Sequence, residues 1–455
     1  MQAWLKNALE YTGEWLDHQM RLTGQPGCVL AVAHKGRVIF ERAYGHADAV
    51  KRVALTPRHR FRVASHSKSF TAAAILKLRE AGKLGLDDPA GRHVDGLHAS
   101  VAEVTLTQLL SHGAGLVRDG ADAGQWADRR PFANEAELRA ALAAPPAITP
   151  NTCMKYSNHG FGLLGLVIEA VTGEAYGPWI VRNIIDPLKL NETTPDGSSA
   201  PGVPVARGHS AKLPLGRRVV IPGDNPTHTL APATGFVSTA ADQVRFFASL
   251  NPAAKRSLLT PASRRAMLHR QWRDPHSTVE THYGLGLIMG SAGGWEWAGH
   301  GGGFQSGLSN TAMLPGREIC LSVLTNAIDG PAEAWSEGVI GILKTFATRS
   351  PPSARPRPWS GRWWQLKQAI DLVPFADRAA VALPRLLDPF SCADEITVTG
   401  RDQGIISLAD GYGSHGEAAR LVRGRNGRLR EVWLGGTRLV PESRLKSEMK
   451  RKYES

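Results

Sequence analysis

Cysteine is scarce in this sequence. Four occur among 455 residues, and no two of them form a C-x-x-C pair: Cys28, Cys153, Cys320 and Cys392. A disulfide-stapled secreted domain or a structural zinc module would need more cysteines at closer spacing. We therefore expect reduced thiols and a cytoplasmic location.

Long apolar runs are missing as well. No stretch reaches the roughly 20 predominantly apolar residues that a membrane-spanning helix needs. In residues 1–22, charged positions such as Glu10, Glu14 and Asp17 alternate with apolar ones. This pattern predicts an amphipathic helix and not a signal peptide, which would need an unbroken apolar segment. We expect no membrane partner.

Several catalytic signatures are absent too. The sequence contains no G-x-S-x-G, so the nucleophile elbow of α/β-hydrolases is excluded. It has no H-E-x-x-H, and its 16 histidines show no metal-ligand spacing. Neither a P-loop nor a dinucleotide fingerprint is present. We expect no cofactor and no metal ion.

The formal net charge is +13, which admits an acidic partner such as nucleic acid. The densest basic stretch, residues 420–430, contains Asn426-Gly427, a hairpin turn signal between alternating residues. Its arginines are expected to lie mostly on the solvated side of a two-stranded ribbon. No RNA-binding or zinc-finger signature accompanies them, so we expect no nucleic-acid partner.

One stretch indicates chemistry. A β-like run ends at Ser65, a strong helix pattern follows, and Lys68 lies three positions after the serine. Positions i and i+3 share a helix face, so a desolvated and therefore neutral lysine there could take the serine's proton. Alone, S-x-x-K is a weak signal: the serine could be an ordinary helix cap. Two further matches, at residues 443–446 and 447–450, lie in a charged tail.

A second motif is Tyr156-Ser157-Asn158, which follows a turn-rich loop and precedes an apolar helix beginning near Phe161. A tyrosine beside a lysine can share a proton with it and serve as base and then as acid. An asparagine there can orient the lysine and a substrate amide. Seen alone, Tyr156 could equally be an ordinary loop tyrosine.

A third motif is a strand that runs into His300 and three consecutive glycines. Glycines after a strand allow close backbone approach to a ligand, so Gly302 is a candidate for lining the site. The N–H group of Gly303 could pair with that of Ser65 as a two-donor oxyanion hole. The alternative is a flexible turn.

In this order, the three motifs resemble those of the serine β-lactamase and penicillin-recognising hydrolase family. The closest likeness is to its branch of D-aminopeptidases and β-lactamase-fold esterases. The resemblance covers roughly residues 24–348. Supporting stretches are residues 108–116, 234–239 and 283–286.

The resemblance implies a role for each site residue. Ser65 would be the nucleophile, Lys68 and Tyr156 the proton-transfer pair, and Asn158 an orienting residue. The strand from His300 to Gly303 would line the site. The implied substrate is a small molecule or short peptide.

The sequence departs from the S-D-N and K-T-G pattern of class A β-lactamases. Where that pattern has a lysine to hold a carboxylate, this chain has His300, which is mostly neutral at pH 7. This favours a serine hydrolase acting through an acyl-enzyme on esters or D-amino-acid amides and peptides. The alternatives are a β-lactamase or DD-carboxypeptidase, and a non-catalytic scaffold that kept the fold.

The expected fold class is α+β. We expect a β-lactamase/transpeptidase-like domain over residues 1–350, in which an antiparallel sheet (about 24–84 and 239–350) is interrupted by a helical insert (about 85–238). A Pro-rich linker (351–360), a small antiparallel β-barrel-like domain (361–442) and the charged tail (443–455) would follow.

Overall fold

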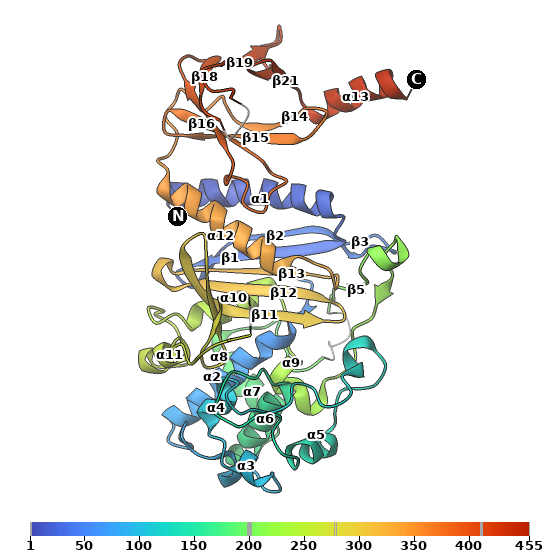
Figure 1. Cartoon of the computed structure of the whole chain (residues 1–455), viewed down its shortest axis with the longest axis vertical. Helices are drawn as coiled ribbons and strands as arrows, with labels where there is room; N and C mark the ends of the chain where they lie inside the picture. The colour runs from blue at the N-terminus through green and yellow to red at the C-terminus, as the bar shows by residue number, and fades with distance from the viewer. Residues whose placement is uncertain (1, 198–202, 277, 279, 410–412, 455) are drawn as a thin grey trace. The chain divides into compact units, whose positions relative to one another are not determined.

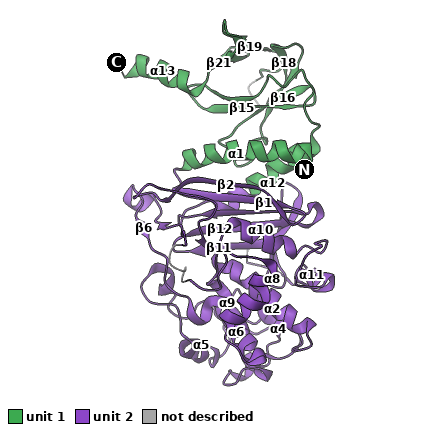
Figure 2. Ribbon diagram, turned by 180° about the vertical axis from the view of Figure 1, so that it is seen from behind, with its two compact units in different colours: residues 1–23, 337–455 green, residues 24–336 purple. Residues whose placement is uncertain are grey.

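The computed structural model describes residues 2–197, 203–276, 278, 280–409 and 413–454. The chain forms two compact units, which Figure 2 colours separately. The larger unit is Gly24–Ser336, and the smaller combines Met1–Thr23 with Glu337–Ser455. This grouping differs from the expected domain limits, because the first helix joins the C-terminal part. It stays a prediction that the expected domains fold independently of one another.

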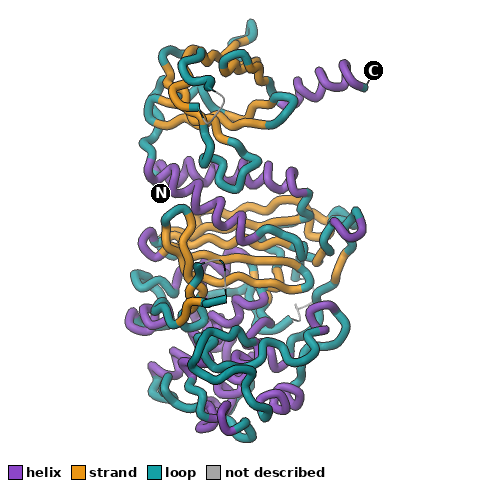
Figure 3. The backbone as a smooth tube through the Cα atoms, viewed as in Figure 1, coloured by secondary structure: helices purple, strands orange, loops and turns teal. Residues whose placement is uncertain are grey.

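The larger unit is built on a nine-stranded antiparallel sheet, drawn together as orange strands in Figure 3. Its strand order is β3-β2-β1-β13-β12-β11-β10-β9-β8. The strands are β1 (Gly27–His34), β2 (Arg37–Asp48), β3 (Val53–Ala54), β8 (Trp272–Arg273), β9 (His282–Tyr283), β10 (Ile288–Ala292), β11 (Trp295–Phe304), β12 (Gly307–Leu314) and β13 (Ile319–Thr325). The strands at the centre of the order come from both ends of the unit, which confirms an antiparallel sheet interrupted by an insert.

The hairpin of β1 and β2 shows how local sequence determines this sheet. Strand β1 is buried along nearly its whole length, as its unbroken apolar sequence predicts. The two strands are joined at Lys35 and Gly36, both with positive φ (52° and 74°). Two such residues in succession match the type I′ turn that right-handed strand twist favours. The strand-like runs at residues 28–33 and 37–44, with turn residues 34–36 between them, predict this hairpin, and the structure confirms it.

Helices of the larger unit pack against its sheet (Figure 1). Helix α10 (Ala240–Ser249) packs on β1, β12 and β13, while α2 (Ser67–Glu80) packs against α6 and α9. The remaining helices lie mostly in residues 85–238. They are α3 (Ala99–Ala102), α4 (Leu106–Leu110), α5 (Glu135–Leu142), α6 (Asn158–Thr172), α7 (Tyr176–Ile180), α8 (Asp186–Leu188), α9 (Ala231–Thr234) and α11 (Pro261–Met267).

The run at residues 284–289 predicts a strand, and this prediction is wrong over the first four residues. Residues 284–287 lie between β9 and β10 without pairing as a strand. Gly286 has φ +68°, and a Cβ there would lie 2.5 Å from the Cβ of Ala72. Gly286 lets this connection approach α2 closely. Gly284 lets it approach the end of α11, where an added Cβ would lie 2.2 Å from the Met267 carbonyl oxygen.

The smaller unit contains an eight-stranded antiparallel sheet whose strands follow the chain order. They are β14 (Gly361–Trp364), β15 (Ala369–Phe375), β16 (Arg378–Ala382), β17 (Asp394–Val398), β18 (Gln403–Leu408), β19 (Ala418–Arg423), β20 (Leu429–Leu434) and β21 (Thr437–Leu439). A bridge between Trp364 and Val440 nearly closes it, which agrees with the expected barrel-like domain. Its helices are α1 (Ala3–Thr23), most of α12 (Ala332–Thr348) and α13 (Glu442–Tyr453).

Two expectations about surface segments can be compared with the smaller unit. The basic stretch forms the hairpin of β19 and β20, and Arg420, Arg425, Arg428 and Arg430 are exposed, as predicted. The charged tail forms helix α13, which buries none of its residues. In the part of the chain that the structure describes, no helix has the length and apolarity to cross a membrane.

The Pro-rich segment at residues 351–360 is more than a spacer. Its Trp359 is completely buried and joins the apolar core enclosed by the eight-stranded sheet. A linker interpretation based on proline content misses this anchor, because composition does not show which side chain finds a core.

We predict that Trp359→Ala lowers the free energy of unfolding of the smaller unit by about 3–5 kcal/mol, since it empties a large buried volume. Leu366→Ala is the matched control, because Leu366 is 65% exposed and its truncation leaves no cavity. Denaturant unfolding followed by circular dichroism measures both. Equal, small effects of the two variants would contradict the anchor role.

Candidate active site

Ser65 lies at a tight junction between a strand and a helix. Strand β4 (Phe61–Arg62) leads into a 3₁₀ turn, η1 (Ala64–His66), which continues directly into α2. Ser65 is therefore in the turn before the α-helix and not in the helix itself, a small correction to the expected position. Ala64 has φ +48°, a conformation that costs a non-glycine residue on the order of 1 kcal/mol. This strained junction holds Ser65 half-exposed among buried neighbours.

Lys68 is fully buried beside Ser65. Its Nζ lies 3.2 Å from Ser65 Oγ, 2.7 Å from Asn158 Oδ1 and 2.9 Å from the carbonyl oxygen of Ala233. Burial holds the pKa of Lys68 well below its usual value. A neutral amine has two N–H groups and one lone pair. The two oxygen acceptors take both N–H groups, which leaves the lone pair for the Ser65 hydroxyl.

Tyr156 completes the contacts to the nucleophile. Its hydroxyl lies 2.8 Å from Ser65 Oγ. Burial raises the pKa of Tyr156, so the phenol stays protonated and donates to the serine oxygen. Tyr156 comes from the loop just before α6, and α2 carries Lys68. The fold thus brings together two motifs that are 91 residues apart in sequence.

Asn158, the first residue of α6, orients the lysine. Its Oδ1 accepts from Lys68, and its Nδ2 donates to Asp119 Oδ1 at 2.6 Å. A carboxylate only accepts, so this contact determines which way the amide points. The backbone N–H of Asn158 donates to the carbonyl of Arg118 at 3.0 Å, which ties the same loop to the start of α6.

Arg118 and Asp119 are site neighbours that sequence reasoning missed. Arg118 Nε lies 3.2 Å from Asp119 Oδ2, and its guanidinium lies 5.2 Å from the centre of the Tyr156 ring. The Asp119 side chain is only 6% exposed, and its negative charge raises the pKa of Lys68 against the larger effect of burial. The only signal in the sequence is their position just after the stretch at residues 108–116.

Asp119→Asn is expected to move the acidic limb of the kcat/KM profile to lower pH. The carboxylate raises the pKa of Lys68, so its removal lowers that pKa further and keeps the amine neutral in more acidic solution. The amide oxygen of asparagine can still accept from Asn158. Asp122→Asn, a change at an exposed aspartate of the same loop, should leave the profile in place. A shift of the limb to higher pH would contradict the assignment.

The glycine-rich segment is a strand and not a flexible turn. Strand β11 continues through His300, Gly301, Gly302 and Gly303, and His300 pairs with Thr311 of β12. The His300 side chain is 1% exposed. Its Nδ1 lies 2.6 Å from the carbonyl of Gly301, and its Nε2 lies 3.0 Å from the Tyr283 hydroxyl.

These contacts determine the charge of His300. Nδ1–H donates to the carbonyl, and Nε2 accepts from the tyrosine. Burial is the main cause that holds the pKa of His300 well below its usual value. The imidazole is therefore neutral, as the sequence predicted. Its contact with substrate and the oxyanion role of Gly303 stay predictions.

Gly302 lies where β11 meets the turn that carries Ser65. A Cβ at this position would lie 2.1 Å from the Val63 carbonyl oxygen and 3.0 Å from His66 Nδ1. The same carbonyl accepts from His66 Nδ1 at 2.8 Å, and His66 Nε2 lies 2.9 Å from Thr311 Oγ1 of β12. Burial lowers the pKa of His66 to about 4, so at neutral pH it is an uncharged link between the turn and the sheet.

Gly302→Ala should reduce the rate of acylation at Ser65 by about a hundredfold or more, because its methyl group displaces the turn and a shift of about 1 Å has that effect on catalysis. Gly301→Ala is the matched control, since the nearest atoms to its added Cβ lie 3.7 and 3.8 Å away. Rapid-mixing measurements of acylation compare the two. Equal loss in both variants would mean that the approach at Gly302 is not what positions Ser65.

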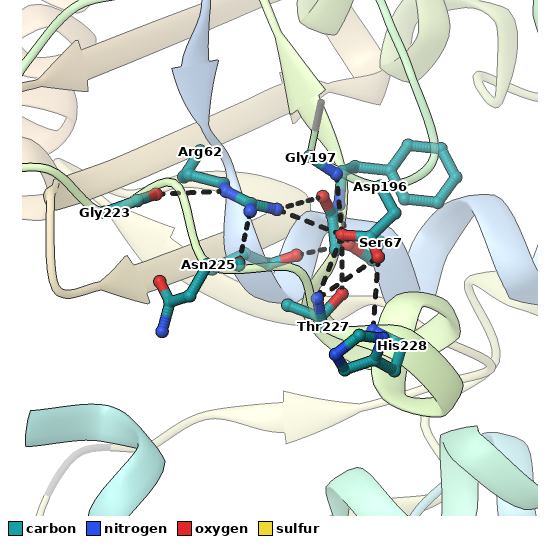
Figure 4. A network of polar contacts seen from close by, with 11 residues as sticks. Arg62, Ser67, Asp196, Gly197, Gly223, Asn225, Thr227 and His228 are labelled. Carbon is teal, nitrogen blue, oxygen red and sulfur yellow. Dashed lines mark hydrogen bonds and ion pairs between the residues drawn. The ribbon is translucent and has the colours of Figure 1, made fainter. Parts of the chain in front are cut away.

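A buried arginine supports the wall next to the nucleophile (Figure 4). Arg62, at the end of β4, donates to the carbonyls of Gly223, Asn225 and Gly235 and pairs with Asp196 at 3.2 Å. Its side chain is 5% exposed. Because Gly235 directly follows α9, which supplies the Ala233 carbonyl to Lys68, Arg62 holds in place the segment that binds the lysine.

Two histidines are neighbours of the motifs in sequence, and adjacency alone predicts structural rather than catalytic roles for them. His112 packs against Tyr156, with ring centres 4.2 Å apart, and its Nδ1 accepts from the Ser157 N–H at 3.2 Å. It therefore supports the loop that carries Tyr156. His159 is buried on the first turn of α6.

Among the described residues, no three His, Cys, Asp or Glu side chains are grouped so as to hold a metal ion, and all four cysteines are free.

Comparisons with known proteins show the family to which the chain belongs. A protein-family profile described as "Beta-lactamase" matches residues 14–337. The chain is similar to "Protein flp" of Staphylococcus aureus, with 29% identity over 183 residues, which are 39% of this chain. The matched part is 36% of the length of that relative, so the chain spans about a third of it.

Solved structures extend the likeness over more of the chain. A D-stereospecific amidohydrolase from Streptomyces sp. is 28% identical with a TM-score of 0.61, covering 73% of this chain and 97% of that one. An octameric penicillin-binding protein homologue from Pyrococcus abyssi covers 95% of this chain and 100% of its own, with a TM-score of 0.67 and 22% identity. The second likeness concerns the fold alone, and it includes the C-terminal β unit.

Proposed function

This chain belongs to the β-lactamase family, and on that premise we propose that it is a serine hydrolase working through a covalent acyl-enzyme on amide or ester bonds. The observation that carries the proposal is the fully buried Lys68 amine, whose Nζ lies within hydrogen-bonding distance of two carbonyl oxygens and of Ser65 Oγ. A structural lysine would be paired with a carboxylate instead, since burying an unpaired ammonium is very unfavourable.

Acylation then follows from the positions of the groups. Ser65 Oγ attacks the carbonyl carbon of the substrate as its proton passes to Lys68 Nζ. The carbonyl oxygen becomes an oxyanion, which the N–H groups of Ser65 and Gly303 are proposed to stabilise. The tetrahedral intermediate collapses as the leaving nitrogen or oxygen takes a proton from Tyr156, which recovers one from Lys68. The bond from the carbonyl carbon to the leaving group breaks, and an ester on Ser65 remains.

Deacylation repeats these steps with water. The water proton passes to Lys68 through the Tyr156 hydroxyl, which accepts it while giving its own proton to the amine, and the water oxygen attacks the ester carbon. The second tetrahedral intermediate then collapses, the bond to Ser65 Oγ breaks, and Lys68 returns the proton to Ser65 Oγ. Asn158 keeps the lysine in place throughout, because it accepts from Nζ whether the amine is neutral or protonated.

We propose amides or peptides of D-amino acids as the substrate class, with esters as further substrates. The neutral His300 supplies no positive charge for a carboxylate beside the scissile bond. Arg118, whose guanidinium lies beside the Tyr156 ring, is paired with Asp119, which offsets its positive charge. The similarity to a D-stereospecific amidohydrolase supports the same class. The alternative, a β-lactamase or DD-carboxypeptidase, requires a binding site for such a carboxylate.

The test compares D-alanine p-nitroanilide, L-alanine p-nitroanilide, p-nitrophenyl acetate and a cephalosporin. We expect turnover of the D-anilide and the ester, a lower kcat/KM for the L-anilide, and little turnover of the cephalosporin. Intact-protein mass spectrometry should show an acyl group on Ser65. Ser65→Ala should lose several orders of magnitude in kcat/KM.

The outcomes separate the candidate functions. A cephalosporin hydrolysed faster than the anilides would favour the β-lactamase alternative over the proposed substrate class. Ser65→Ala with nearly full activity would refute the serine mechanism. Ser69→Ala is a suitable control, because Ser69 is a fully buried residue of α2 whose hydroxyl donates to the Gly286 carbonyl.

A further inference from the structure

A cavity lies in the larger unit, away from the Ser65 site, at the edge of the sheet that β3 forms. Its volume is about 830 Å³. One wall comes from the end of β2 and from β3, and the other from a two-stranded ribbon of β5 (Gly208–His209) and β6 (Val220–Ile221) with its flanking residues. None of its lining residues belongs to the Ser65 site described above.

Backbone contacts hold the two walls together. The N–H of Arg207 donates to the Ala47 carbonyl at 2.8 Å, and the N–H of Ala49 donates to His209 Nε2 at 3.1 Å. His209 is completely buried, and its Nδ1 lies 3.0 Å from the Asn326 carbonyl. The cavity is therefore part of the folded structure and not a gap between loose loops.

The walls of this cavity are aliphatic, and several side chains are exposed to an unusual extent. Val50 is 68% exposed, Val53 47% and Val205 37%. Val219 and Val220 continue the same lining. Exposed apolar side chains that gather around one cavity are typical of a ligand-binding surface. The only aromatic ring among the described lining residues belongs to His59, so a stacked nucleobase is disfavoured.

Three cations that line the cavity form no ion pair within 4.0 Å among the described residues: Lys51, Arg207 and Arg217. Lys51 interacts electrostatically with Asp48 at longer range. Arg218 also lines it, but that side chain is paired with Asp329 at 2.5 Å. The one lining carboxylate, Asp48, accepts from the N–H groups of Val50 and Lys51 at 3.0 and 2.9 Å. The cavity thus has an excess of positive charge beside an aliphatic wall.

We propose that this cavity binds a dissolved amphipathic anion, with an acidic head group at Lys51, Arg207 and Arg217 and an aliphatic chain along the valines. The head group would form charge-assisted hydrogen bonds with the two guanidinium groups, and the chain would cover the exposed valine side chains. A medium-chain carboxylate has both parts and fits the size of the cavity.

The test is calorimetric titration of the whole protein with sodium dodecanoate below its micelle concentration. Saturable binding of one dodecanoate is expected. Acetate, which has the head group without the chain, and dodecyltrimethylammonium, which has the chain with the opposite charge, should not bind over the same range. Arg207→Gln combined with Arg217→Gln should weaken dodecanoate binding by about tenfold or more.

One control and one further variant test whether binding occurs in this cavity. Arg425→Gln with Arg428→Gln removes two exposed arginines of the β19–β20 hairpin and should leave the dissociation constant unchanged. Val205→Asp, which places a negative charge on the aliphatic wall, should weaken binding without altering turnover at Ser65. Equal affinity in the Arg207/Arg217 variant, or equal binding of the cationic surfactant, would overturn the proposal. Binding to phosphatidylglycerol vesicles without binding of dissolved dodecanoate would overturn it in favour of a membrane surface.

Discussion

The candidate site depends on the burial of one amine. Lys68 is surrounded by groups that accept hydrogen bonds, and the nearest carboxylate, Asp119, contacts it only through Asn158. This arrangement disfavours the ammonium form without excluding it, so the amine can take up a proton during a reaction and release it again. Tyr156 and Asn158 have their roles because of this state: one donates to Ser65, and the other determines where the amine points.

Backbone geometry provides the second constraint. The turn at Ser65 is held by the strained Ala64, by His66 bonded to Val63 and Thr311, and by a strand that approaches to a distance only Gly302 allows. Arg62 holds the segment that supplies the Ala233 carbonyl. These contacts come from β4, β11, β12 and α9. The position of Ser65 is therefore a property of the whole larger unit and not of the S-x-x-K motif.

Prediction from the sequence succeeded where a signal is local. The hairpin at residues 27–48, helices α6 and α10 and the strands of the smaller unit follow from periodicity and turn residues. It failed where a contact with a distant element overrides the local pattern. The segment at residues 284–287 leaves the strand conformation because it packs on α2, and Trp359 leaves a Pro-rich segment to enter an apolar core. Contacts between elements far apart in the chain leave no periodic or compositional pattern in the local sequence, so they cannot be predicted from it.

The sequence by itself determined the chemistry that is available: a serine and a lysine one turn apart, a tyrosine and an asparagine before an apolar helix, and a histidine followed by glycines. Motif spacing also indicated the family, because these groups occur in the same order. Only the tertiary structure decided that Lys68 is desolvated, that Asp119 and Arg118 lie beside it, and that His300 is neutral with both nitrogens engaged. The physical reason is that a pKa depends on burial and on neighbouring charges, and both are set by residues far away in sequence.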